Sequence, residues 1–216
     1  RREEKLKILA QELGGSHQLL IFDVRDKKAV FKAINSLPED YKKIDLLINN
    51  AGNAHGLDPV HKADLDDWDT MIDANVKGLM YVTKAVLPGM VALKKGHIIN
   101  LGSIAGKEVY PNGNVYCSSK AAVDFFTQGL RIDLNPLGIR VGAIHPGLVE
   151  TEFSNVRFKG DEKRSKRVYE GIQALTADEV ADALLYMAKV PEKVNVADLI
   201  LLPTGQANAY INNRIK

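Results

Sequence analysis

Several features that would give this 216-residue chain a metal-dependent or disulfide-stabilised character are scarce or missing. The single cysteine, Cys117, excludes an internal disulfide, and there is no cysteine cluster of the kind that binds zinc. The five histidines show no metal-ligand spacing; they stand at positions 17, 55, 61, 97 and 145. We therefore expect no metal site, a packing role for Cys117 and ordinary polar or strand-end roles for the histidines.

The chain also lacks the charge and the long apolar segments typical of nucleic-acid or membrane partners. Its formal net charge is +2, no run of about 18 apolar residues occurs, and residues 1–5 do not have a signal-peptide pattern. Six basic residues stand in segment 157–167 against Asp161 and Glu162. No aromatic platform accompanies them, so we interpret this segment as a flexible solvated flap. A cytoplasmic protein with neither a nucleic-acid nor a membrane partner is expected.

Short apolar runs alternate with helical periodicity along the chain, and a 45% hydrophobic content is ample for a core. The expected strands are 19–24, 44–48, 97–101, 139–144 and 199–202, and the expected helices are 1–13, 29–37, 64–90, 115–135 and 177–188. Strands that are apolar almost throughout and alternate with helices predict a parallel sheet covered on both faces. No repeat or linker divides the chain, so we expect a single α/β domain over residues 1–216.

Polar and glycine-containing clusters fall at the carboxyl ends of the expected strands. They are Asp23, residues 49–52, Ser103 and the segment from Pro146 onward. In open α/β sheets ligands bind outside the carboxyl ends of the strands. These clusters therefore predict the ligand site.

Tyr116 and Lys120 stand four residues apart in an expected helix, so both side chains lie on one face of that helix. An unperturbed tyrosine has a pKa of about 10, and lowering it by roughly three units takes about 4 kcal/mol of differential interaction. A neighbouring ammonium favours the phenolate, so we expect Lys120 to lower the pKa of Tyr116 and to make it a general acid and base. The hydroxyl of Ser103 could hold a substrate oxygen against Tyr116.

The motifs of the chain, taken together, are Asn49-Asn50-Ala51-Gly52, Asn75, Ser103, Tyr116, Lys120, and Pro146-Gly147 with Thr151. In this order they resemble the short-chain dehydrogenases/reductases over nearly the whole chain. The resemblance implies a Rossmann-type, doubly wound fold, a nicotinamide cofactor and a catalytic tetrad of Asn75, Ser103, Tyr116 and Lys120. Tyr116 would exchange a proton with the substrate oxygen, which Ser103 would orient. Lys120 would also bind the nicotinamide ribose, and Asn75 would hold a water that links Lys120 to solvent.

The resemblance also implies contacts to the cofactor. The pair at 23–24 would contact the adenine, the residues at 49–52 would form the wall of the cofactor groove, and the segment 146–151 would hold the carboxamide. The expected cofactor-binding residues are Arg1, Arg2, Asp23, Val24, Asn49, Asn50, Ala51, Gly52, Tyr116, Lys120, Pro146, Gly147, Val149 and Thr151.

The glycine-rich turn of such folds, which normally follows the first strand, does not occur ahead of Asp23. We therefore expect roughly 30 to 40 further residues upstream in the working protein, the size of one βαβ unit. In the strand order 3-2-1-4-5-6 the first two strands lie between the third and the fourth. If they were absent, the sheet would have a gap between the third and fourth strands. Arg1 and Arg2 would then follow the second strand, where an arginine accommodates the 2′-phosphate. We expect NADP rather than NAD.

The stretch 146–160 and the region from Ala174 to Thr204 are similar to a subgroup, the NADP-dependent 3-hydroxy acid dehydrogenases. That similarity implies serine, allo-threonine and related small 3-hydroxy acids as substrates. Arg157 is the candidate to hold their carboxylate because of its fork geometry, although a charge on a mobile lid is an equal alternative. Ser103, Tyr116 and Arg157 are thus the expected substrate residues. The resemblance also implies a homotetramer, which the family commonly forms. Two alternatives remain for the function: a reductase of other carbonyl substrates, 3-oxoacyl or general ketone, and a catalytically silent nucleotide sensor.

Overall fold

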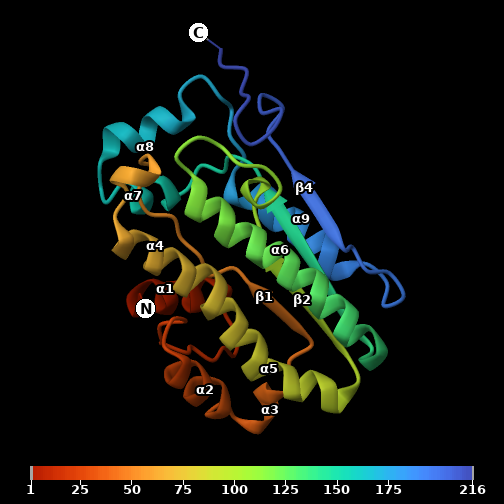
Figure 1. Ribbon diagram of the computed structural model, residues 1–216. Helices are drawn as coiled ribbons and strands as arrows, with labels where there is room; N and C mark the ends of the chain where they lie inside the picture. Colours follow the sequence, from red (N-terminus) through yellow and green to blue (C-terminus); the bar gives the residue numbers. More distant parts are fainter. Residues whose placement is uncertain (1, 216) are drawn as a thin grey trace.

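A parallel four-stranded sheet forms the centre of the computed structural model, which describes residues 2–215 (Figure 1). The strands lie in the order β1-β2-β3-β4 and are Leu46–Asn49, Gly96–Leu101, Ile139–Pro146 and Asp198–Leu201. β2 and β3 pair from Gly96 opposite Ile139 to Leu101 opposite Ile144. Because all pairs are parallel, the carboxyl ends of the strands meet at one edge of the sheet.

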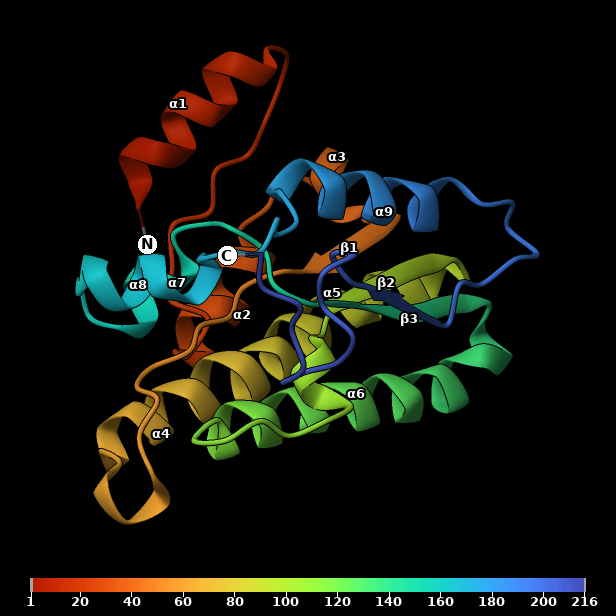
Figure 2. The ribbon, with the colours of Figure 1, turned by 90° about the horizontal axis from the view of Figure 1, so that it is seen from above.

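Helices cover both faces of this sheet. Among the described residues the α-helices are α1 Glu3–Leu13, α2 Lys27–Asn35, α3 Glu39–Lys42, α4 Leu65–Ile72, α5 Leu79–Leu93, α6 Asn114–Leu134, α7 Phe153–Arg157, α8 Glu162–Tyr169 and α9 Ala177–Lys189. Figure 2 shows α5 and α6 on one face and α9 on the other, whereas α1 stands away from the sheet and buries none of its residues. The Rossmann-like doubly wound fold expected from the sequence is confirmed.

Adjacent isoleucines in β2 show why the strand needs apolar side chains on both of its faces. Ile98 belongs to the core beneath α5 and α6, and Ile99 belongs to the core beneath α9. Successive side chains of a strand point to opposite faces, and both of these are fully buried. Burying each of these side chains stabilises the folded state by roughly 1.5–3 kcal/mol.

A buried polar ladder crosses the sheet between these cores. The amide nitrogen of Asn49 donates to Thr83 Oγ1 and to Asn100 Oδ1, both at 2.9 Å. The amide nitrogen of Asn100 donates to Thr127 Oγ1 at 2.8 Å, and that hydroxyl donates to the carbonyl of Val123. The ladder therefore joins β1 and β2 to α5 and α6 through satisfied hydrogen bonds.

The expected strand at 19–24 is wrong, because residues 18–23 adopt no regular structure. Within the described residues no strand pairs with the outer edge of β1, where Leu46 and Ile48 are exposed. An apolar run without a pairing partner cannot satisfy its backbone groups as a strand. The segment 157–167, expected as a flexible solvated flap, contains the end of α7 and most of α8. Most of its side chains are exposed, as expected, whereas Phe158 and Ser165 are buried.

The expected helix at 64–90 is a continuous helical run from Leu65 to Leu93 with one irregularity. Residues Asp73–Gly78 form a π-helical segment between α4 and α5. By length and composition alone this 29-residue run could cross a membrane. In the structure it packs against β1, α2 and α6, as a helix that covers a sheet does.

A buried histidine gives the fold a pH dependence. His97, in β2, is 3% exposed, and neither ring nitrogen has a hydrogen-bond partner among residues 2–215. Burial, together with the charge of Arg140, lowers its pKa from 6.5 to about 4. Between pH 6.5 and about 4, His97 therefore binds a proton in the unfolded chain but remains neutral in the folded chain. The contribution of His97 to the free energy of unfolding is fully present above about pH 6.5. It falls by about 3 kcal/mol as the pH drops to about 4.

We expect His97→Leu to remove this loss between pH 6.5 and 4, measured as the urea dependence of tryptophan fluorescence. The exposed His61→Leu is the matched control and should keep the wild-type pH dependence. An equal loss of stability in wild type and His97→Leu would assign the effect to other groups.

Candidate active site

A cleft of about 730 Å³ opens at the carboxyl ends of β1, β2 and β3. It lies where open α/β sheets bind ligands. The lining residues come from the strand ends, from α6, from segment 146–156 and from α9; they are Arg2, Ile48, Asn50, Gly52, Asn53, Leu101, Gly102, Ser103, Tyr116, Lys120, Pro146, Gly147, Val149, Thr151, Glu152, Phe153, Val156, Ala177, Val180, Ala181 and Leu184. Ser103, Tyr116 and Lys120 thus meet in one cleft.

Lys120 is buried in α6, and its ammonium donates to the carbonyl of Leu101 at 2.8 Å. Burial lowers the pKa of Lys120 to about 8, because water no longer solvates the charge. The lysine is therefore fixed at the end of β2 and can lose a proton near physiological pH.

Burial raises the pKa of the Tyr116 phenol, opposite to the direction expected from the sequence. Tyr110 adds to this rise, and the hydrogen bond with Ser103 and the charge of Arg157 oppose it. The expectation considered only the neighbouring ammonium. In the structure that ammonium bonds to Leu101, and loss of water around the phenol has the largest effect. The described site therefore holds Tyr116 protonated.

Ser103 begins the 3₁₀ turn Ile104–Gly106 that follows β2. Its hydroxyl accepts from the backbone N–H of Ala105 at 3.1 Å and lies 3.5 Å from the carbonyl oxygen of Pro146. The turn holds the hydroxyl between the ends of β2 and β3, on the side of Tyr116.

Asn75 lies behind the cleft wall, in the π-helical segment, and is 1% exposed. Its amide oxygen accepts from the backbone N–H of Asn53, and its amide nitrogen donates to the Asn53 carbonyl and to Ser119 Oγ. A Cβ on Gly52 would lie 3.1 Å from that amide oxygen and 3.5 Å from Lys120 Nζ. Asn75 thus connects the wall of the cleft with α6, and such π-helical irregularities are frequent at functional sites.

The expected cofactor residues divide into two groups. Those that line the cleft are Arg2, Asn50, Gly52, Tyr116, Lys120, Pro146, Gly147, Val149 and Thr151. Asp23, Val24, Asn49 and Ala51 are not among the lining residues. Arg1 lies outside the described residues.

Three of the residues outside the lining have other contacts. The side chain of Asn49 belongs to the polar ladder. Asp23 pairs with Arg25 at 2.8 Å. The side chain of Val24 lies so close to Gly78 that a Cβ there would be 2.8 Å away.

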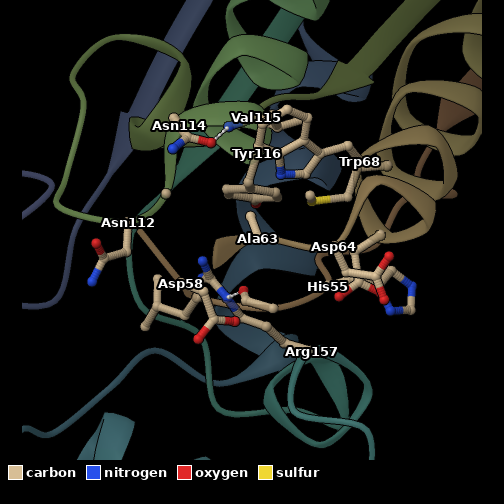
Figure 3. Close-up of a pocket in the computed structure, with 15 residues that line it drawn as sticks. His55, Asp58, Ala63, Asp64, Trp68, Asn112, Asn114, Val115, Tyr116 and Arg157 are labelled. Carbon is tan, nitrogen blue, oxygen red and sulfur yellow. Dashed lines mark hydrogen bonds between the residues drawn. The ribbon is translucent and has the colours of Figure 1, made fainter. Parts of the chain in front are cut away.

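Arg157, in α7, lies beside Tyr116 in a second, smaller pocket (Figure 3). Its Nε donates to the carbonyl of Gly56 at 3.0 Å and its Nη1 donates to the hydroxyl of Tyr110 at 2.9 Å. The guanidinium carbon is 5.6 Å from the centre of the Tyr116 ring. The pocket's free volume of about 20 Å³ has room for little more than one water. Lys159, which pairs with Asp67 at 2.8 Å, holds the segment after α7 against α4; we call residues 153–169, which contain α7 and α8, the lid.

The family description short chain dehydrogenase matches residues 1–162 of this chain. The chain belongs to the short-chain dehydrogenase family. The NADP-dependent 3-hydroxy acid dehydrogenase YdfG of Escherichia coli (strain K12) is 47% identical over 213 residues, which are 98% of this chain and 86% of that protein. Sulfoacetaldehyde reductase 2 of Chromohalobacter salexigens is 46% identical over 96% of this chain and 83% of its own length.

A solved structure of the same family also matches. The closed form of serine dehydrogenase complexed with NADP+ has a TM-score of 0.94 and 46% identity, and the match covers 100% of this chain and 88% of that one. The expected oxidoreductase class and the resemblance to the 3-hydroxy acid dehydrogenase subgroup are confirmed.

Sequence reasoning missed part of this short-chain dehydrogenase's cleft wall. Four residues of α9 line it: Ala177, Val180, Ala181 and Leu184. Their spacing of three and four residues was readable as one helix face, but periodicity does not say what such a face covers. Asn53 and Gly102 directly follow or precede predicted residues, and this adjacency was the available signal.

Proposed function

We propose that this chain is an NADP-dependent oxidoreductase that transfers hydride between the nicotinamide and the C3 hydroxyl or carbonyl of small 3-hydroxy acids. The observation that carries the proposal is the convergence of Ser103, Tyr116 and Lys120 in one cleft of a chain that is 47% identical to a named 3-hydroxy acid dehydrogenase. Bound NADP supplies or accepts the hydride.

The chain's own residues supply the proton and the orientation. In the reducing direction, Tyr116 gives its phenolic proton to the substrate oxygen, and that oxygen becomes the hydroxyl. Ser103 donates a hydrogen bond that holds the same oxygen. Lys120, whose pKa of about 8 allows proton exchange near neutrality, returns a proton toward Tyr116. Asn75 holds the water through which Lys120 reaches solvent.

The cleft fits a dinucleotide by its position and by its backbone-lined walls. Gly52 and Gly147 present no side chain to it, and added Cβ atoms there would crowd Asn75 and Gln206. Asn50, Pro146, Val149 and Thr151 line the same cleft. Arg2 lines the cleft and pairs there with Glu152 at 2.5 Å; in exchange for that exposed ion pair its guanidinium can pair with a 2′-phosphate, which supports NADP over NAD.

An anionic group near the reacting carbon is the feature we assign to the substrate. The two relatives are named for 3-hydroxy acids and for sulfoacetaldehyde. In both kinds of compound one carbon separates the acid group from the reacting carbon. Arg157 lies beside Tyr116 and presents the cation that such a group needs. Sulfonate-bearing aldehydes are therefore the second candidate substrate class.

We also propose a cytoplasmic homotetramer. Phe125 and Ile132 lie on α6, are 72% and 74% exposed, and face away from the sheet. Large apolar side chains on the exposed face of a helix are typical of subunit interfaces.

Replacement of the phenol tests the acid–base role. We expect Tyr116→Phe to lower kcat by roughly 10²- to 10⁴-fold, because the general acid is lost while the ring remains. The change is measured as NADPH absorbance with malonic semialdehyde or serine, beside NADP binding followed by fluorescence. Tyr186→Phe, at an exposed position of α9, is the control and should match wild type. Full turnover by Tyr116→Phe would contradict the proposed role, and NADP binding without turnover in wild type would favour a silent nucleotide sensor.

Removal of the lid cation tests the substrate class. We expect Arg157→Met to raise KM for malonic semialdehyde and sulfoacetaldehyde by roughly 10- to 100-fold, the value of a charged hydrogen bond, and to leave propanal unaffected. Arg164→Met is the matched control, since this lid arginine lies over Phe158 and does not line either pocket. Equal losses with charged and uncharged aldehydes would show that Arg157 only supports the lid.

The assembly is tested by light scattering. We expect the mass of four chains in solution, and a smaller species for Phe125→Glu because it places a charge on the proposed contact face. Val60→Glu, at another exposed apolar side chain in the 3₁₀ turn Val60–Lys62, is the control. A monomeric wild type would contradict the tetramer.

A further inference from the structure

Four charged or titratable side chains meet behind Ser103, outside both pockets. Lys107 follows the 3₁₀ turn that Ser103 begins, Asp124 lies in α6, His145 lies in β3, and Asp198 begins β4. We call these four residues the His145 cluster. They come from four elements, and none of them lines the cleft or the smaller pocket.

Short contacts connect all members of the His145 cluster. The ammonium of Lys107 lies 2.9 Å from Asp124 Oδ2 and 2.7 Å from Asp198 Oδ2. The Nε2 atom of His145 lies 2.8 Å from Asp198 Oδ1 and 3.7 Å from Asp124 Oδ1. His145 is fully buried, and the Asp124 side chain is 10% exposed. The contact between Lys107 and Asp124 is therefore screened less by solvent than the contacts of Asp198, whose side chain is 45% exposed.

The arrangement resembles a metal site in its ligand atoms but not in its charge. Ligand atoms of Asp124, His145 and Asp198 lie within 4.8 Å of one another. The ammonium of Lys107 already stands between the two carboxylates and offsets their charge. A divalent ion would have to displace this tethered cation, so we assign the cluster a positioning role.

His145 contacts the backbone that carries Ser103. Its Nδ1 lies 3.3 Å from the carbonyl oxygen of Ser103. A Cβ on Gly102 would lie 2.4 Å from the same nitrogen, so the ring packs directly on the backbone before Ser103. The N–H of Gly102 also donates to the carbonyl of Ile144 at 2.8 Å. The ring thus sets how far the Ser103 turn stands from β3.

The other end of the turn is fixed to α6. A Cβ on Gly106 would lie 2.7 Å from the carbonyl oxygen of Lys120, so the turn packs on the helix backbone at that residue. Asp124, which binds Lys107, is one helical turn beyond Lys120. The His145 cluster therefore joins the Ser103 turn to the helix that carries Tyr116 and Lys120.

We propose that the His145 cluster positions the Ser103 hydroxyl opposite Tyr116. Asp198 and Asp124 pack beside Nε2 of His145, which has no hydrogen-bond partner among the described residues, and so confine the ring against the Ser103 backbone. Lys107 keeps both carboxylates in place. These are positioning residues that touch neither substrate nor cofactor. The inference rests on the proposed function, because it requires that Ser103 orient the reacting oxygen.

A double-mutant cycle between His145 and Ser103 tests the proposal. We expect His145→Gln to lower kcat by roughly 10- to 100-fold, the cost of a displacement of about 1 Å, with little change in NADP affinity. In a Ser103→Ala background the same substitution should cause no further loss, since it acts only through the missing hydroxyl. A full additional loss in that background, or an equal loss of NADP affinity, would overturn the proposal. No effect of Ser103→Ala alone would refute the role of Ser103 in the proposed function instead.

Milder substitutions cover the case in which His145→Gln does not fold. Asp198→Asn and Lys107→Met remove one charge each from the less buried side of the cluster and should lower kcat in the same way. Lys107→Arg keeps the cation and should restore most of the activity. Lys95→Met is the matched control, because Lys95 forms ion pairs with Asp45 and Glu192 and all three side chains are exposed. Wild-type kcat in folded Asp198→Asn and Lys107→Met would overturn the proposal.

Discussion

The parallel pairing of β2 with β3 is the constraint on which the arrangement of the site depends. The two strands pair up to Leu101 opposite Ile144, and β3 continues only to Pro146, so their carboxyl ends lie close together. The chain leaves β2 through Gly102 and Ser103 and ends β3 with Pro146, and α6 between them returns along the same face. Ser103 and the segment from Pro146 are therefore adjacent in space although more than one helix separates them in sequence.

Burial decides the electrostatics of this site more than proximity does. Loss of water raises the pKa of Tyr116 and lowers the pKa of Lys120, so both side chains are pushed toward their neutral forms. A phenol that keeps its proton is a suitable donor in the reducing direction. The same two groups, read from sequence, suggested a phenolate stabilised by an ammonium. Sequence spacing placed both side chains on one helix, and both line the cleft, but it gave no information on how far each is buried from water.

The parts of the fold that followed from sequence are those with a strong local signal. The apolar runs at 97–101 and 139–144 and the helix around Tyr116 are as expected, because each buries a continuous face. The run at 19–24 has the same composition, yet a strand needs a neighbour as well as apolar residues. The helices α7 and α8 were missed because charged residues dominate α8, and its buried contacts come from only a few positions such as Ser165.

The site residues divide in the same way. Short motifs led to Ser103, Tyr116 and Lys120, whose side chains line the cleft. The motif that contains Asn49 gave no indication of which of its side chains faces the cleft and which faces the core. Alternation along β1 turns Asn49 inward and leaves Asn50 in the cleft wall. Contacts from α9 and the His145 cluster depend on tertiary packing, which no local pattern records.

The polar ladder has a consequence for how the strands find their alignment. Asn49 and Asn100 are directly opposite each other in β1 and β2. A slip by one position would oppose an isoleucine to an asparagine and leave buried amides without partners, at a cost of roughly 1–3 kcal/mol for each. Apolar side chains alone would tolerate such misalignment far better, since one isoleucine packs almost as well as the next. The ladder therefore selects one register of β1 against β2, and through that register it fixes where Asn50 and Gly52 stand in the cleft wall.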